Sequence, residues 1–264
     1  MKQRVNGTTL FVQDQGQGAP IILLHGFPLD HRMWQSQVDA LSPSYRVIAP
    51  DFRGMGQSDV PVSPMSLTHY AQDILAIMDE KGIEKATLGG FSMGGYVALA
   101  LLRLAPERFS ALIFANTRPE PDGQEGRKNR MNMAVNLYDK GPAAARDAML
   151  PKLVTPATLQ DQPQLIDDLR TAMDSMPAEG LVHASIAMAF REDSVELLSS
   201  IQVPTLVIAG EQDAIAPPDV MKAMADRIAG AQFHVIPSAS HLTPMEKPEA
   251  FNDLLFSFLQ EITP

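Results

Sequence analysis

Short runs of apolar residues recur along the chain, and stretches with helical spacing separate them. Six runs rich in Val, Ile and Leu cover residues 20–24, 45–49, 85–88, 111–115, 204–209 and 233–236. Turn-forming residues bound each run, and the runs lack polar alternation, which is typical of strands buried on both faces. The intervening residues 30–41, 67–81, 93–105 and 217–228 are long enough for crossover helices. The alternation predicts an α/β fold with a mostly parallel sheet and helices on both faces, and residues 8–13 predict an antiparallel hairpin at its edge.

One long segment interrupts this alternation. From Thr117 to about Leu197 no strand-like run occurs, and one helical pattern follows another. The segment begins with the turn-rich residues 119–123 (PEPDG), and its apolar residues between Leu165 and Met176 share one helical face. We therefore expect a helical cap, or lid, over residues 117–197, inserted into an α/β core made of residues 1–116 and 198–264.

Composition and charge exclude several classes of function. The net charge is −10, which argues against binding to nucleic acids and anionic membranes. The chain has no cysteine, so disulfides, thiolate nucleophiles and cysteine-based zinc sites are excluded. The N-terminus lacks the apolar core of a signal peptide, and no apolar run approaches the ~18 residues that span a bilayer. We expect a soluble cytoplasmic protein and leave its oligomeric state open.

A serine lies in a motif that carries chemistry. Residues 90–94 (GFSMG) fit G-x-S-x-G, directly after a predicted strand and at the start of a predicted helix. A nucleophile elbow requires this strand-turn-helix setting, because the sharp turn pushes the serine Oγ out above the sheet. The motif predicts Ser92 as a nucleophile, and the alternative is a structural turn that contains a serine.

A serine nucleophile needs a general base, and six histidines are available. His241 lies in residues 237–242 (PSASHL), just after the last predicted strand and at the same sheet edge as Ser92. His234 lies inside that strand, where a structural role is expected. The other four precede the position where such a fold places the base, and none has metal-binding spacing; they are His25, His31, His69 and His183. We therefore predict His241 as the base.

The acid of the predicted triad follows the strand over residues 204–209. Asp213 lies in the loop 210–214 (GEQDA), with local capping of the backbone as the alternative role. Glu211 is a weaker candidate, because one strand-exit loop normally presents a single carboxylate inward. Asn116 and Thr117, after the preceding strand, offer no acid. The chain order Ser92, Asp213, His241 is that of one serine-hydrolase fold and differs from the two common serine-protease orders.

Two backbone N–H groups are candidates for an oxyanion hole. The first is that of Met93, directly after the nucleophile, and the second is that of Phe27 in residues 25–28 (HGFP). Each donor is worth roughly 10² to 10³ in rate. The candidate substrate-binding side chains are Phe27, Trp34, Arg127 and Arg130. The two arginines have a second interpretation, a solvated basic stretch at the start of the cap.

These motifs together resemble the α/β-hydrolase superfamily over essentially the whole core. The resemblance is carried by residues 25–28, 51–59 (DFRGMGQSD), 90–94, 210–213 and 240–241. Within the superfamily the pattern is similar to small bacterial esterases, 3-oxoadipate enol-lactonases and cofactor-free haloperoxidases. The resemblance implies that the 51–59 loop with Arg53 is structural and that His25 stabilises its own loop. A serine at the elbow argues against dehalogenases and epoxide hydrolases, which use a carboxylate there.

The sequence therefore predicts a hydrolase of carboxylic esters that forms an acyl-enzyme and needs no metal or organic cofactor. Because the histidine base must be neutral, we expect activity to fall below roughly pH 6 to 7. One alternative is hydrolysis of a lactone, whose carboxylate would require an arginine in the pocket. The other is a receptor that keeps the triad, turns its ligand over slowly and exposes an apolar patch on its cap. The cap carries no motif that selects a substrate.

Overall fold

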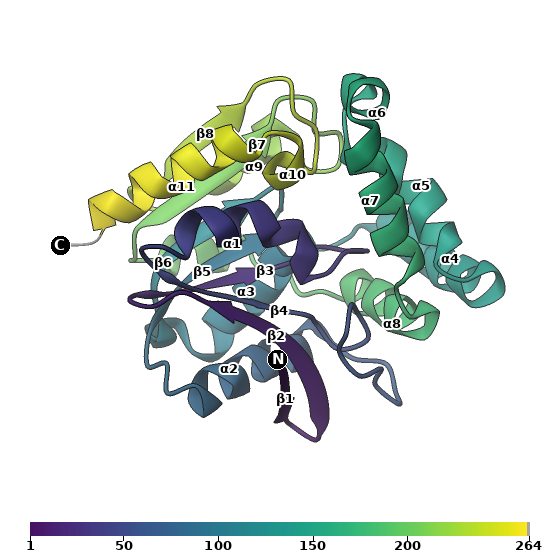
Figure 1. The fold of residues 1–264 in the computed structure, drawn as a ribbon, viewed down its shortest axis with the longest axis horizontal. Helices are drawn as coiled ribbons and strands as arrows, with labels where there is room; N and C mark the ends of the chain where they lie inside the picture. The colour runs from purple at the N-terminus through teal and green to yellow at the C-terminus, as the bar shows by residue number, and fades with distance from the viewer. Residues whose placement is uncertain (263–264) are drawn as a thin grey trace.

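Eight strands form a single mixed sheet in the computed structural model, which describes residues 1–262 (Figure 1). Their order is β1-β2-β4-β3-β5-β6-β7-β8; β1 pairs with β2 and β2 with β4 in antiparallel fashion, and the other pairs are parallel. The strands are β1 (Lys2–Val5), β2 (Thr8–Gln15), β3 (Pro20–Leu24), β4 (Arg46–Pro50), β5 (Ala86–Phe91), β6 (Phe109–Ala115), β7 (Thr205–Gly210) and β8 (Gln232–Ile236). The predicted α/β fold, with its mostly parallel sheet and antiparallel edge, is confirmed.

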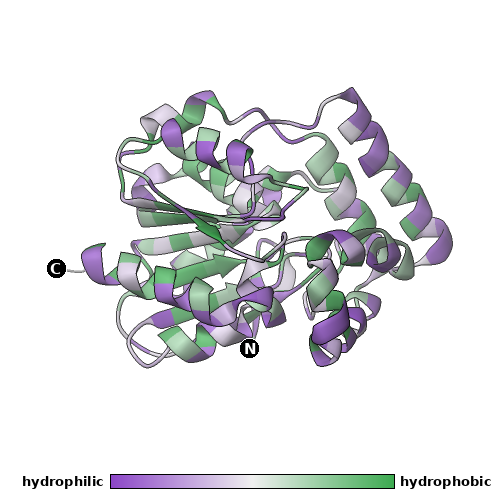
Figure 2. Cartoon of the chain, turned by 90° about the horizontal axis from the view of Figure 1, so that it is seen from above, coloured by the Kyte–Doolittle hydropathy of each residue, from purple (hydrophilic) through white to green (hydrophobic). Residues whose placement is uncertain are grey.

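Helices cover both faces of this sheet because both faces are apolar. Ile22 and Leu24 of β3 pack in one hydrophobic cluster with α2 (Leu67–Glu80), α3 (Met93–Leu104) and α9 (Pro218–Asp226). Ile21 and Leu23, which point the opposite way, pack in a second cluster with α1 (Gln35–Leu41) and α11 (Pro248–Ile262). Figure 2 shows apolar residues gathered along the strands and polar residues on the outer helices. The lack of polar alternation along the strands follows from this double burial.

Several boundaries differ from those expected from the sequence. Strand β5 runs to Phe91, three residues beyond the predicted end at Leu88, so that it leads directly into the turn at Ser92. The predicted helix 30–41 is a short 3₁₀ turn, η1 (His31–Trp34), followed by α1. The helix α11 was not predicted, and the short elements η2 (Pro106–Arg108), η3 (Glu196–Ser200) and α10 (Thr243–Glu246) were not either. Short elements depend on tertiary contacts more than on local periodicity.

Five helices lie between β6 and β7 and form what we call the helical insertion. They are α4 (Gln124–Lys140), α5 (Ala143–Leu153), α6 (Pro156–Asp161), α7 (Pro163–Asp174) and α8 (Ala178–Ala189). Figure 1 shows them together at one side of the sheet. The insertion joins both hydrophobic clusters: Leu137 and Leu181 pack in the first, and Leu153 and Leu169 in the second. All five helices lie inside the proposed cap, residues 117–197.

Among residues 1–262, no helix has both the length and the apolar composition that are needed to cross a bilayer.

Candidate active site

Ser92 occupies a sharp turn between β5 and α3. Its backbone has φ 51° and ψ −114°, a conformation that non-glycine residues rarely adopt. The Ser92 N–H donates to the Ala115 carbonyl (3.0 Å), and the Thr117 hydroxyl donates to the Ser92 carbonyl (2.8 Å), so the neighbouring strand β6 holds the turn. A Cβ on Gly94 would lie 2.2 Å from the Leu24 carbonyl oxygen, which is why the motif needs glycine there.

A continuous line of hydrogen bonds joins three residues from distant parts of the chain. The Oγ of Ser92 lies 2.9 Å from Nε2 of His241, and Nδ1 of His241 lies 2.8 Å from Oδ2 of Asp213. His241 and Asp213 are buried, at 1% and 3% exposed, whereas Ser92 is partly exposed. The structure therefore brings together the predicted nucleophile, base and acid in the order that proton transfer requires.

The carboxylate of Asp213 is held at both oxygens. Its Oδ1 accepts hydrogen bonds from the N–H groups of Ile215 (2.7 Å) and Ala216 (3.0 Å), and its Oδ2 accepts from His241 and from Nδ2 of Asn116 (2.9 Å). Burial by itself raises the pKa of Asp213, but the charge of His241 and these hydrogen bonds together lower it below its ordinary value. Asp213 is thus kept ionised, as is required of a group that orients an imidazole.

Asn116 is a functional residue that the sequence did not indicate. It follows β6 with φ 48°, is fully buried, and donates to the acid of the triad. The hydroxyl of Thr243 donates to its Oδ1 (2.6 Å), which fixes the amide so that its NH₂ group faces Asp213. The sequence located Asn116 only as a position without an acid. A polar residue at the carboxyl end of a central strand was the available signal.

Two N–H groups border the space around Ser92 without a partner. Within residues 1–262, neither Phe27 nor Met93 donates its backbone N–H to another group of the protein. The loop with Phe27 passes close to the nucleophile, since a Cβ on Gly26 would lie 3.2 Å from the Cβ of Ser92. This proximity fits the predicted oxyanion hole, in which both N–H groups face the developing charge.

The loop after β3, which contains Phe27, is stabilised by His25, a buried residue. Its Nε2 accepts a hydrogen bond from the Phe52 N–H (3.0 Å), so the proton is on Nδ1, which donates to the Gly26 carbonyl (3.0 Å). Burial lowers the pKa of His25, which is therefore neutral. His25 joins the loop after β3 to the loop after β4 and lies away from proton transfer.

The other predicted residues lie apart from the triad. Trp34 is buried (1% exposed) and its ring lies against Phe91 and Phe251, with centroid distances of 6.4 and 6.1 Å. Arg130 forms an ion pair with Asp122 (3.2 Å), and Arg127 is exposed. Within the described residues 1–262, neither arginine forms a hydrogen bond or ion pair with the triad.

Two remaining predictions concern Glu211 and Phe27. The carboxylate of Glu211 accepts a hydrogen bond from the Ser238 N–H (2.8 Å) at the surface, whereas Asp213 in the same loop points inward. The Phe27 side chain is buried (3% exposed) in the first hydrophobic cluster. Of the two carboxylates in this loop, only Asp213 contacts the histidine.

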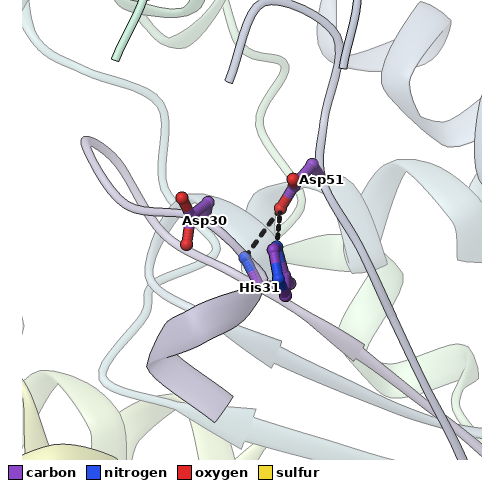
Figure 3. Close-up of side chains that lie close together, drawn as sticks. All are labelled: Asp30, His31 and Asp51. Carbon is purple, nitrogen blue, oxygen red and sulfur yellow. Dashed lines mark hydrogen bonds and ion pairs between the residues drawn. The ribbon is translucent and has the colours of Figure 1, made fainter. Parts of the chain in front are cut away.

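A second cluster of polar residues lies on the loops after β3 and β4 (Figure 3). Ligand atoms of Asp30, His31 and Asp51 lie within 4.8 Å of one another, and all three residues are buried. Oδ1 of Asp51 accepts from the backbone N–H (2.8 Å) and the ring Nδ1 (2.7 Å) of His31, and Asp30 forms an ion pair with Arg32 (2.6 Å). These bonds engage the atoms that would ligate a metal, so the cluster is best described as a brace between two loops.

Relatives of known function support an assignment by family. The chain is 35% identical over 258 residues to 3-oxoadipate enol-lactonase 1 of Acinetobacter baylyi, covering 97% of this chain and 95% of that protein. A thermophilic esterase from Thermogutta terrifontis, solved with malate bound, superposes with a TM-score of 0.96 at 39% identity, over 100% of this chain and 97% of the other. The enol-lactonase of Burkholderia xenovorans superposes with a TM-score of 0.92 at 31% identity, over 98% and 100%.

The sequence profile of the alpha/beta hydrolase fold matches residues 19–248. The matched region contains β3 to β8, the helical insertion and the three residues of the hydrogen-bonded line. With the elbow at Ser92 and the sheet order in agreement, this chain belongs to the α/β-hydrolase family.

Proposed function

We propose that this hydrolase cleaves carboxylic esters through an acyl-enzyme intermediate on Ser92. The observation that carries the proposal is the line of hydrogen bonds from Ser92 through His241 to Asp213, with two unpartnered N–H groups beside it. The likeness to an esterase at 39% identity supports the same chemistry. No step of the reaction draws on a group other than those of the chain, the ester and water.

Acylation begins when neutral His241 takes the proton from the Ser92 hydroxyl as Oγ attacks the ester carbonyl carbon. The carbonyl π electrons move to oxygen, and the resulting oxyanion is stabilised by the N–H groups of Phe27 and Met93. Asp213 stabilises the imidazolium and holds its tautomer. When the tetrahedral intermediate collapses, the bond to the alcohol oxygen breaks and His241 donates its proton to the leaving alcohol.

Deacylation repeats these steps with water in place of serine. His241 removes a proton from a water molecule, which attacks the acyl carbon, and the same two N–H groups stabilise the second oxyanion. Collapse returns the proton to Oγ of Ser92 and releases the carboxylic acid. The acid loses its proton to solvent, and the enzyme is restored.

The deciding test is removal of the nucleophile. Ser92→Ala is expected to lower kcat on a short p-nitrophenyl ester by at least about 10⁴-fold, while Ser110→Ala, an exposed serine on β6, leaves it unchanged. A serine-directed phosphonate should label the wild type at Ser92, as measured by mass spectrometry of the peptide. Wild-type turnover in Ser92→Ala, or labelling at another serine with equal speed, would overturn the proposal.

Hydrolysis of a lactone is the second candidate, and the 35% identity to an enol-lactonase favours it. An anionic lactone needs a cation near the site, and Arg127 is the exposed candidate, because Arg130 is already paired with Asp122. If this candidate is correct, Arg127→Ala raises KM for an anionic lactone but not for a neutral ester. Lys128→Ala, the exposed neighbour, is the matched control. If Arg127→Ala and Lys128→Ala have the same KM for the anionic lactone, the result favours ester hydrolysis as the function.

A slow-turnover receptor remains as a third candidate because of one surface on the insertion. Met131, Val135 and Tyr138 of α4 are 41%, 58% and 86% exposed and share one helical face. An apolar surface of this kind is expected of a protein that signals to a partner. Multiple turnovers of a simple ester per enzyme molecule per second would exclude the receptor, and a single burst without turnover would support it.

A further inference from the structure

The backbone on either side of His241 is hydrogen-bonded toward the helical insertion. The Leu242 N–H donates to the carbonyl of Leu153 at the end of α5 (2.7 Å). The Ser240 N–H donates to Oε2 of Glu246 (2.7 Å), which belongs to the short helix α10. The residues on both sides of the proposed general base, Ser240 and Leu242, are therefore each held through their N–H group.

Glu246 extends this connection to the insertion. Its second oxygen, Oε1, accepts hydrogen bonds from the N–H of Thr155 (2.7 Å) and from the hydroxyl of Thr158 (2.8 Å). Thr155 is also the N-cap of α6, and its side chain accepts from the Thr158 N–H (3.0 Å). One carboxylate thus joins the loop of the histidine to the start of α6.

Burial makes the position of Glu246 depend on both sides. The residue is 3% exposed, and within residues 1–262 it forms no ion pair. A buried carboxylate without a counter-ion is tolerated only when its oxygens are satisfied by hydrogen bonds. Two of its three donors belong to the insertion and one belongs to the histidine loop, so a shift of either element leaves an oxygen of Glu246 unsatisfied.

We propose that Glu246 is a positioning residue that couples the helical insertion to the general base His241. The inference rests on the proposed function, since it takes His241 as the base. When residues 153–158 move, Glu246 and Leu153 carry the movement to the N–H groups of Ser240 and Leu242, the residues on either side of the histidine. His241 Nε2 lies 2.9 Å from Ser92 Oγ, and a misplacement of about 1 Å in such a contact can lower the rate 10²-fold. Substrate that orders the insertion therefore also orders the base.

A merely structural role for Glu246 makes a different prediction from a coupling role. If the carboxylate only stabilises the fold, its loss lowers the melting temperature but leaves kcat per folded molecule unchanged. If it positions His241, its loss lowers kcat while KM stays close to the wild-type value, because within residues 1–262 Glu246 forms no hydrogen bond or ion pair with a residue proposed to bind substrate. The reactivity of Ser92 toward a phosphonate falls in parallel, since that reaction also needs the base.

The test compares Glu246→Gln, Thr158→Val and the control Ser185→Ala in the full-length chain. Gln keeps the size of the side chain but presents an NH₂ group to donors, and Val removes only the hydroxyl bond on the insertion side. Ser185 is fully buried in α8 and donates to the Arg130 carbonyl (2.8 Å), so its loss removes a partly buried hydrogen bond that joins α8 to α4 and involves neither Glu246 nor the histidine loop.

We expect kcat and the phosphonylation rate to fall about 10- to 100-fold in Glu246→Gln and about threefold in Thr158→Val, with KM within twofold. In the double variant the kcat should equal that of Glu246→Gln alone, because both changes break one connection. Ser185→Ala should lose thermal stability and keep its kcat. Measurements are made on protein shown to be folded by circular dichroism, well below its melting temperature.

Two results would overturn the coupling. One is a kcat for Glu246→Gln within twofold of the wild type, and the other is an equal loss of kcat in Ser185→Ala. If Glu246→Gln does not fold, Thr158→Val with unchanged kcat and phosphonylation rate is decisive against it. These outcomes are separate from failure of the proposed function, which would appear as retained activity in Ser92→Ala.

Discussion

The α/β core and the helical insertion differ in how completely their residues are enclosed. All six residues of β5 and all six of β7 are buried, and nine of the twelve residues of α3 are buried as well. In α4, the longest helix of the insertion, only Ala134 and Leu137 of 17 residues are buried. Core positions are thus constrained from every side, whereas most positions of α4 have contacts on one side only.

This difference in burial affects how strongly the residue type is constrained at each position. In the core, the reactive groups lie on turns in which a larger side chain would collide with the backbone. Few residue types are therefore compatible with these positions. Most positions of α4 can change their side chains without loss of the fold, and the insertion to which α4 belongs lies at one side of the sheet (Figure 1). We therefore expect substitutions in the core to abolish activity and substitutions in the insertion to change stability or selectivity.

The largest effect is expected at the acid of the triad. Asp213→Asn keeps the shape of the side chain but reverses the hydrogen bond to His241, and we expect kcat to fall about 10³- to 10⁴-fold. Glu211→Gln, two residues earlier in the same loop, should change kcat less than twofold because the carboxylate of Glu211 accepts from the Ser238 N–H at the surface and does not contact His241. Steady-state kinetics on a short ester would check both, and similar losses in the two variants would contradict the assignment.

Gly94 provides the next comparison, now in stability. Its missing side chain leaves room for the Leu24 carbonyl, 2.2 Å from where a Cβ would lie, so Gly94→Ala must displace backbone. We expect the free energy of unfolding to fall by about 3 kcal/mol or more. Gly123, at the N-cap of α4, has open space around its Cβ position, and Gly123→Ala should change stability by no more than about 0.5 kcal/mol. Urea unfolding curves measure the free energy of unfolding of both variants. Equal values for Gly94→Ala and Gly123→Ala would show that the elbow tolerates a side chain.

An ion pair in the insertion should have an intermediate effect. Asp122 pairs with Arg191 (2.8 Å), whose side chain is 4% exposed and whose guanidinium lies 4.3 Å from the centroid of the Tyr96 ring on α3. Asp122→Asn removes the negative charge that pairs with buried Arg191 and with Arg130, and should lower the free energy of unfolding by about 2 kcal/mol, with kcat on a short ester kept within threefold. Asp174→Asn, from a more exposed pair, should cost less than about 0.5 kcal/mol. A loss of kcat above tenfold in Asp122→Asn would contradict the expectation that changes outside the core affect stability more than catalysis.

The smallest effect is expected at the sheet edge and depends on pH. The hydrogen bond from Arg46, opposed by burial and aided by Lys81, lowers the pKa of Asp14 from 3.8 to about 2. Because the folded pKa is the lower one, the stabilisation is present above about pH 4 and is lost as pH falls toward 2. Asp14→Asn should cost about 1 to 2 kcal/mol at pH 7, and the difference from wild type should narrow below pH 4. Asp39→Asn, at an exposed position of α1, should change the free energy of unfolding at pH 7 by no more than about 0.5 kcal/mol.

Much of the architecture could be predicted because its signals are local. The run at 20–24 is apolar throughout and the run at 204–209 is apolar except for Thr205, and that pattern alone identified β3 and β7 within one residue. The order of Ser92, Asp213 and His241 also followed from strand-exit loops, each of which lies at the same edge of a parallel sheet. The helix α11 was missed although its buried residues Phe251, Leu255, Phe258 and Leu259 have helical spacing, so a local signal was present. The extra residues of β5 include two glycines, which weaken the strand pattern.

The hydrogen bonds that hold the triad and its loops could not be predicted, because they join residues that are distant in the chain. Asn116 and Asp213 are 97 residues apart, and Glu246 and Thr155 are 91 apart. Nothing in the spacing of either pair indicates contact. The partnership of Asp30, His31 and Asp51 was also missed, since the ring of His31 meets Asp51 across 20 residues.

The sequence by itself determined the class of fold, the elbow that exposes Ser92 and the residue types available for its chemistry. Each of these depends on the steric demands of a short segment: a buried strand excludes polar residues, and a sharp turn before a helix excludes side chains at Gly94. Only the tertiary structure decided which polar groups satisfy Asp213, that the insertion belongs to both hydrophobic clusters, and that Glu246 links it to His241. Hydrogen bonds and burial act between atoms close in space, and the chain order carries no record of that closeness.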